Sequence, residues 1–149
     1  MPADRLLLPS AVRETLHERR AAGAPQEVCG VLLGDRATDS DDETTPDVGD
    51  PLADRVVEAV AVDNVAADPE RFYELDPTET VAVVEDAETR GLAVVGFYHT
   101  HPRGPASPSS VDRDRATWVG YVYCIVAPDD VVAYRWTGEQ FRSLRVETP

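Results

Sequence analysis

Runs of apolar residues along the chain predict a core of several strands. Residues 28–34 and 92–98 are almost continuously apolar, which is typical of strands covered on both faces. Residues 55–62 alternate between apolar and polar positions, with Val56, Val57, Val60 and Val62 expected to pack inward. The six predicted strands are Val28–Gly34, Arg55–Val62, Leu92–Tyr98, Tyr121–Ala127, Val131–Trp136 and Gln140–Val146.

Three helices are predicted between these strands. The first covers Pro9–Ala22, with Pro9 in its first turn. The second begins at the capping residue Asp76 and ends at Gly91, and the third runs from Ser109 to near Trp118. The residues expected to face the sheet are Val12 and Leu16 in the first helix and Val81, Val84 and Ala87 in the second.

The order of these elements predicts a mixed α/β sandwich in a single domain, with helices packed on the sheet. A chain of 149 residues is long enough to form one substantial core. Residues 35–54 depart from the pattern, because they include eight Asp or Glu and two Pro but few apolar residues. We expect this segment to be a mobile acidic loop between two strands rather than a linker to a second domain.

The charge balance narrows the range of partners. The chain has 28 acidic and 14 basic residues, a net charge of −14, and all the basic residues are arginine. Such a chain lacks the basic surface that nucleic-acid binding requires, so we expect no nucleic-acid partner. The absence of lysine fits either a cytoplasm of high salt or a GC-rich codon bias, and neither indicates a function.

Location is also suggested by composition. The longest apolar stretch, Leu92–Tyr98, is too short to span a bilayer, and the first residues do not resemble a signal peptide. The two cysteines, Cys29 and Cys124, cannot form a disulfide framework. We therefore expect a cytoplasmic protein with no membrane partner.

Candidate chemistry is concentrated at the end of the third strand. His99 and His101 are two residues apart, so they share a face of the strand, with α-carbons about 6.6 Å apart. Asp112 follows after a loop and can supply a third ligand. Two histidines, one carboxylate and a fourth position open to water make up a catalytic metal site, whereas structural zinc sites have four protein ligands.

Simpler interpretations remain open for each residue alone. Ser109 and Asp112 have the spacing of a helix capping box, which needs no metal. A pair of histidines with this spacing also occurs by chance. The third histidine, His17, lies among charged residues of the first helix, where we expect it to be solvated.

Together these residues resemble the signature of the JAMM, or MPN+, metalloproteases. The signature is H-x-H-x7-S-x2-D, which His99, His101, Ser109 and Asp112 match without a gap. The family also has a glutamate just before a strand, which Glu27 resembles; from the sequence alone, Glu58 and Glu74 are equally available. The resemblance implies a single-domain JAMM/MPN fold, a cytidine-deaminase-like mixed β-sheet flanked by helices over residues 1–149.

The resemblance also implies roles for these residues. Zinc would be held by His99, His101 and Asp112, with Glu27 as general base and acid and Ser109 as a donor to the developing oxyanion. JAMM enzymes mostly cleave after the C-terminal Gly-Gly of ubiquitin-like modifiers, and this acidic, lysine-free chain is most similar to members that remove small archaeal modifiers. Ubiquitin-like modifiers and their conjugates are the implied partners. Trp118 and the loop Pro102–Pro108 are candidate walls for the modifier tail, and Arg103 is a candidate contact with an acidic modifier.

Two other functions stay open from the resemblance, namely processing of a ubiquitin-like sulfur carrier and a non-catalytic MPN scaffold. The scaffold is disfavoured because no expected ligand is missing. A zinc nucleobase deaminase would require His-x-Glu and Pro-Cys-x-x-Cys, neither of which occurs. A thiol hydrolase built on Cys29 is disfavoured because burial in a strand raises the pKa of a thiol.

Overall fold

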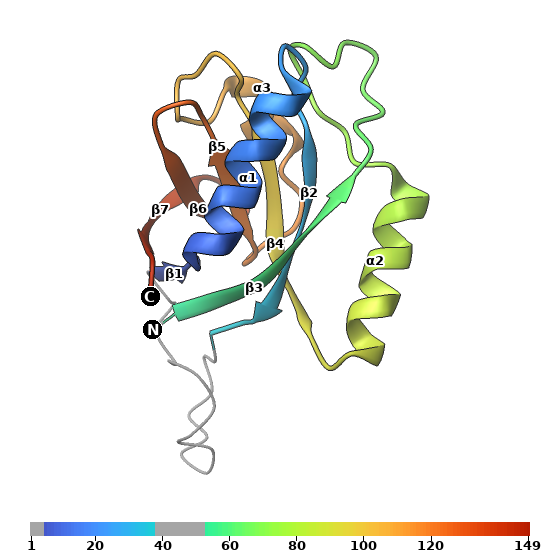
Figure 1. Cartoon of the computed structure of the whole chain (residues 1–149), viewed down its shortest axis with the longest axis vertical. Coiled ribbons are helices and arrows are strands. Elements are labelled where there is room, and N and C mark those ends of the chain that lie inside the picture. The colour runs from blue at the N-terminus through green and yellow to red at the C-terminus, as the bar shows by residue number, and fades with distance from the viewer. Residues whose placement is uncertain (1–4, 38–52) are drawn as a thin grey trace.

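The computed structural model describes residues 5–37 and 53–149 (Figure 1). Residues 38–52 of the predicted acidic loop lie outside these ranges, so its mobility stays a prediction. The elements in chain order are β1 Arg5–Leu7, α1 Ser10–Gly23, β2 Cys29–Asp35, β3 Ala53–Val62, α2 Pro77–Thr89, β4 Ala93–Thr100, α3 Ser110–Arg115, β5 Val122–Val126, β6 Val131–Trp136 and β7 Phe141–Glu147.

The strands form one mixed sheet that closes on itself in the order β1-β3-β2-β4-β5-β6-β7. The β4–β5 pair and both pairings of β1 are parallel, and the other pairs are antiparallel. The predicted mixed α/β class is confirmed, but the sheet is a barrel rather than the layer of a sandwich. The difference arises from β1, whose three residues are too few to produce a recognisable pattern but join β3 to β7.

The central strands are buried on both faces, as their continuous apolar runs predict. Successive strand residues point to opposite sides, and two separate apolar clusters result. Leu32, Tyr98 and Cys124 belong to the cluster under α1, together with Leu16. The opposite cluster, under α2, contains Val31, Leu33, Phe97, Tyr123 and Ala87. Figure 1 shows α1 crossing one side of the sheet while α2 lies apart from it on another.

Two predicted packing residues face solvent instead. Val57 is 43% exposed because its neighbour Val56 points into the core from the same strand. Val81 is 56% exposed because α2 turns Val83 and Ala87, four residues apart, toward the sheet. Val84 is half-buried, and Val12 and Leu16 of α1 are buried as predicted.

Several element boundaries differ from the sequence-based expectation, most of them by one or two residues. Pro9 precedes α1 as its N-cap instead of lying in its first turn. The third helix ends at Arg115 rather than near Trp118, because the backbone N–H groups of Thr117 and Trp118 donate to the Tyr123 hydroxyl. Strand β4 continues to Thr100, so His99 lies within the strand. Among the described residues, no helix has the length and apolar character needed to cross a bilayer.

Candidate active site

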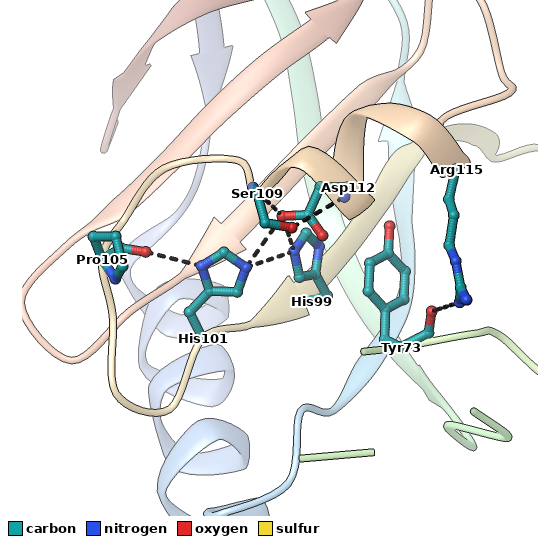
Figure 2. A network of polar contacts seen from close by, with 7 residues as sticks. All are labelled: Tyr73, His99, His101, Pro105, Ser109, Asp112 and Arg115. Atoms are coloured by element: carbon teal, nitrogen blue, oxygen red, sulfur yellow. Dashed lines mark hydrogen bonds and ion pairs between the residues drawn. The ribbon is translucent and has the colours of Figure 1, made fainter. Parts of the chain in front are cut away.

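The end of β4 and the start of α3 bring together the two histidines and the aspartate that the sequence singled out (Figure 2). The Nε2 atoms of His99 and His101 are 3.1 Å apart. Asp112 Oδ2 lies 3.3 Å from His99 Nε2 and 3.2 Å from His101 Nε2. The three ligand atoms therefore form a nearly equilateral triangle, which we call the ligand triangle.

The dimensions of the ligand triangle fit a tetrahedral metal ion. With bonds of about 2.0–2.1 Å to zinc, the ligand atoms of an ideal tetrahedron are about 3.3 Å apart. The three observed edges, 3.1, 3.3 and 3.2 Å, match this value. A site of this kind leaves the fourth corner of the tetrahedron free of protein ligands.

Surrounding contacts fix the orientation of both imidazole rings. His101 Nδ1 lies 2.8 Å from the Pro105 carbonyl oxygen, so Nδ1 donates its hydrogen there, and in the neutral ring Nε2 carries the lone pair that faces the ligand triangle. His99 is 2% exposed. Its ring stacks on Tyr73 at a centroid distance of 4.1 Å and an interplanar angle of 14°. Neither ring can turn away without breaking a contact.

Asp112 belongs to a capping box as well as to the ligand triangle. The Ser109 backbone N–H donates to Asp112 Oδ2 (2.9 Å), and the Asp112 backbone N–H donates to Ser109 Oγ (3.1 Å). The simpler interpretation of this spacing is therefore correct but incomplete. The cap orients the carboxylate toward the histidines, and the Ser109 hydroxyl keeps its own hydrogen for another acceptor.

Electrostatics favour the form that can bind a cation for two groups of the ligand triangle, ionised Asp112 and neutral His99. Burial opposes charge on Asp112, but hydrogen bonds with His101 and His99 prevail and hold the pKa of its carboxyl well below the usual range. Burial lowers the pKa of His99. Burial also acts against charge on His101, but its contacts with Asp112 and Pro105 raise the pKa of this histidine overall.

Glu27 lies beside the ligand triangle, just before β2. One of its carboxylate oxygens is within 4.8 Å of a nitrogen of each histidine. Its side chain is buried, and Oε1 has no hydrogen-bond partner among the described residues. Burial raises the Glu27 pKa to about 8. The positive charge of His101 opposes this rise, and repulsion from Asp112 adds to it. These are the properties of a proton acceptor next to a reaction site.

The other glutamates that the sequence left open lie elsewhere. Glu58 is paired with Arg90 at 2.6 Å on the surface, and Glu74 is exposed in the loop before α2. His17 lies on α1 near Arg13, Arg20 and Asp130 and is half-buried rather than fully solvated. Geometry thus separates Glu27 from its alternatives, which the sequence pattern could not do.

The predicted walls of a tail channel belong to two different grooves. The loop Pro102–Pro108 lines a groove of about 330 Å³ that also contains Glu27, His101 and Ser109. Trp118 lines another groove, of about 520 Å³, with Phe97 and Tyr73. Arg103 is exposed in the first groove.

Three polar or aromatic residues near the site escaped the sequence analysis. Thr100, between the two histidines, accepts a hydrogen bond from the Val28 backbone N–H at 2.9 Å. Tyr73 stacks on His99, and Asn64 binds the Glu27 carbonyl oxygen. The sequence signal available for Thr100 was its place between the two histidines of the H-x-H motif. Asn64 and Tyr73 come from a loop whose folding no local pattern indicated.

Burial of Glu27 predicts a pH-dependent stability of the metal-free protein. A carboxyl whose pKa is raised from 4.5 to about 8 on folding favours the folded state only while protonated. Relative to Glu27→Gln, the wild type should therefore lose stability from about pH 4.5 to about pH 8, at up to about 1.4 kcal/mol per pH unit. Denaturant unfolding of both proteins in chelator measures this difference. A difference that stays constant over that range would contradict the raised pKa.

Comparisons with known proteins agree with this geometry. A family model described as prokaryotic homologs of the JAB domain matches residues 9–138. A desampylase from Haloferax volcanii is 45% identical, with 98% of each chain covered. A probable TtuB-protein conjugate cleaving protease from Thermus thermophilus is 28% identical, over 87% of this chain and 74% of its own length.

The same relationship is visible in the fold. The crystal structure of a JAB1/MPN domain protein from Archaeoglobus fulgidus superimposes with a TM-score of 0.56 at 18% identity, over 95% of this chain and 97% of that one. The resemblance inferred from the motif is confirmed. The chain belongs to the family of prokaryotic JAB-domain proteins.

Proposed function

We propose that this chain is a zinc-dependent isopeptidase that releases ubiquitin-like modifiers by hydrolysis after their C-terminal Gly-Gly. The observation that carries this proposal is the ligand triangle with the buried Glu27 carboxylate beside it, whose Oε1 has no hydrogen-bond partner among residues 5–37 and 53–149. The 45% identity to a desampylase over nearly the whole chain supports the modifier as substrate. In this proposal residues 1–149 form one metalloprotease domain. A cytoplasmic location and the lack of a nucleic-acid partner stay predictions.

In this proposal His99, His101 and Asp112 hold the ion, which when bound acts as a Lewis acid toward water and toward the scissile carbonyl. Glu27 takes a proton from the attacking water and later gives it to the departing amine. A Glu27 pKa near 8 suits both transfers, because the protonated and ionised forms are then accessible at neutral pH.

Ser109 supports the developing negative charge. Its Oγ accepts the Asp112 backbone N–H, which directs the hydroxyl hydrogen away from α3. Ser109, Glu27 and His101 all line the groove of about 330 Å³, so a peptide bound there meets all three side chains. A hydrogen bond to an oxyanion at such a site is typically worth about 2.7–4 kcal/mol.

Cleavage of two matched substrates tests the proposal. One is a modifier joined through its C-terminal Gly-Gly to a lysine side chain, and the other is a linear fusion of the same modifier. Faster release from the isopeptide supports the proposed function, whereas preference for the linear fusion favours the processing peptidase. Binding without cleavage, by protein that contains about one zinc per chain, would indicate the scaffold function instead.

A further inference from the structure

Asn64 follows β3 at the base of the loop that leads to α2, and its side chain forms four hydrogen bonds. Nδ2 donates to the backbone carbonyl oxygens of Glu27 (2.8 Å) and Phe72 (3.0 Å). Oδ1 accepts from the backbone N–H groups of Ala66 and Glu74, each at 3.0 Å. Because a primary amide has two hydrogens to donate and two lone pairs, these contacts use its full capacity.

Hydrogen bonds hold the backbone of Glu27 at both its N–H and its carbonyl oxygen. Its N–H donates to the Pro69 carbonyl oxygen (2.7 Å), and its carbonyl oxygen accepts from Asn64. The next residue, Val28, is tied in turn to Thr100 of β4 through two hydrogen bonds of 2.9 Å. Since Oε1 of Glu27 has no hydrogen-bond partner in the part of the chain that the structure describes, the position of this oxygen depends on how the backbone is held.

The same loop reaches the ligand triangle from another side. Phe72, whose carbonyl oxygen Asn64 binds, precedes Tyr73, and the Tyr73 ring stacks on His99. Arg115 of α3 donates to the Tyr73 carbonyl oxygen at 3.4 Å, as Figure 2 shows. One amide side chain thus connects the backbone of Glu27 to the segment that packs on a ligand histidine.

We propose that Asn64 is a positioning residue for hydrolysis. It fixes the Glu27 carboxylate relative to the ligand triangle by tying the Glu27 backbone to the loop that carries Tyr73. The inference rests on the function proposed above and extends it to a residue outside the H-x-H-x7-S-x2-D signature. Residues that orient catalytic groups or metal ligands typically change activity by about 10–100-fold when replaced.

Asn64→Asp is the informative variant, because it keeps the size and the acceptor oxygen of Asn64 but removes both donors. We expect kcat to fall about 10–100-fold on the isopeptide substrate, with KM and zinc content unchanged. Thr137→Val is a matched control in the turn between β6 and β7. It also removes side-chain-to-backbone hydrogen bonds, those with Glu139 and Gln140, and should leave kcat within twofold.

A double-mutant cycle with Glu27→Gln separates positioning from general stabilisation. If Asn64 acts through Glu27, then Asn64→Asp should not lower the residual rate of Glu27→Gln any further. An equal reduction in both backgrounds, or a kcat within twofold of the Thr137→Val control, would overturn the inference. Should Asn64→Asp fail to fold, Asn64→Ala removes both donors together with the acceptor and is judged by the same criteria.

Amide hydrogen exchange distinguishes failure of this inference from failure of the proposed function. Wild-type protein that cleaves neither substrate would refute the function alone. Exchange at the Glu27 N–H, which donates to Pro69, should still be faster in Asn64→Asp than in Thr137→Val if Asn64 holds the loop. Equal exchange in the two variants would refute the positioning role regardless of activity.

Discussion

Replacing Glu27 by glutamine should abolish most hydrolysis and leave zinc binding intact. Glutamine keeps the size of the side chain but cannot accept the proton of the attacking water. Loss of a general base typically costs about 10²–10⁴-fold in rate. Steady-state kinetics on the isopeptide substrate, with zinc content measured on the same sample, check both parts of this result.

Glu58→Gln is the matched control for that variant. Glu58 was as acceptable as Glu27 from the sequence, but it lies on the surface in an ion pair with Arg90. Its replacement should leave the rate and the zinc content unchanged. Full activity in Glu27→Gln would refute the proposed mechanism, and loss of zinc from this variant would mean that Glu27 is itself a ligand.

Asp112→Asn should remove both zinc and activity while preserving the fold around α3. The amide oxygen of asparagine can still accept the Ser109 backbone N–H, so the capping box survives. Its lack of charge makes it a much poorer ligand for a divalent ion. A bound ion contributes several kcal/mol to the transition state, so we expect a loss of about 10³-fold or more.

Metal analysis after dialysis, together with circular dichroism, tests this result. Asp114→Asn, an exposed aspartate on the same helix, is the control and should retain both zinc and activity. Normal zinc content in Asp112→Asn would exclude Asp112 as a ligand. Unfolding of the variant would show that the contribution of Asp112 is to the helix cap instead.

The grouping of the ligand triangle could be predicted better than its surroundings, because the spacing of its three residues is local. His99 lies on β4 and His101 directly follows the end of that strand, and the capping pattern places Asp112 in the first turn of α3. Strand and helix periodicity are sufficient to predict both facts. Glu27 could be assigned only through the resemblance to a family. Its side chain is buried beside histidines that lie far along the chain, and the residues next to Glu27 do not indicate this.

Long-range contacts account for what could not be predicted. Asn64 bonds to Glu27 across 37 positions in the chain, and Tyr73 reaches His99 from a loop without periodicity. The exposure of Val57 and Val81 depends on which face of β3 and α2 meets the core, and an apolar residue alone does not specify that. Strand β1 was missed because three residues carry too little pattern.

Strand β1 also has a consequence for how the chain folds. It pairs with β7, and Arg5 contacts Glu147 at a separation of 142 residues. Contacts between such distant positions carry a large loop-closure entropy and slow the folding of a domain. During synthesis this pairing has to wait for nearly the whole chain, whereas Glu27, His99, His101 and Asp112 emerge earlier. Closure of the barrel is therefore among the last steps of folding, after every residue of the ligand triangle is available.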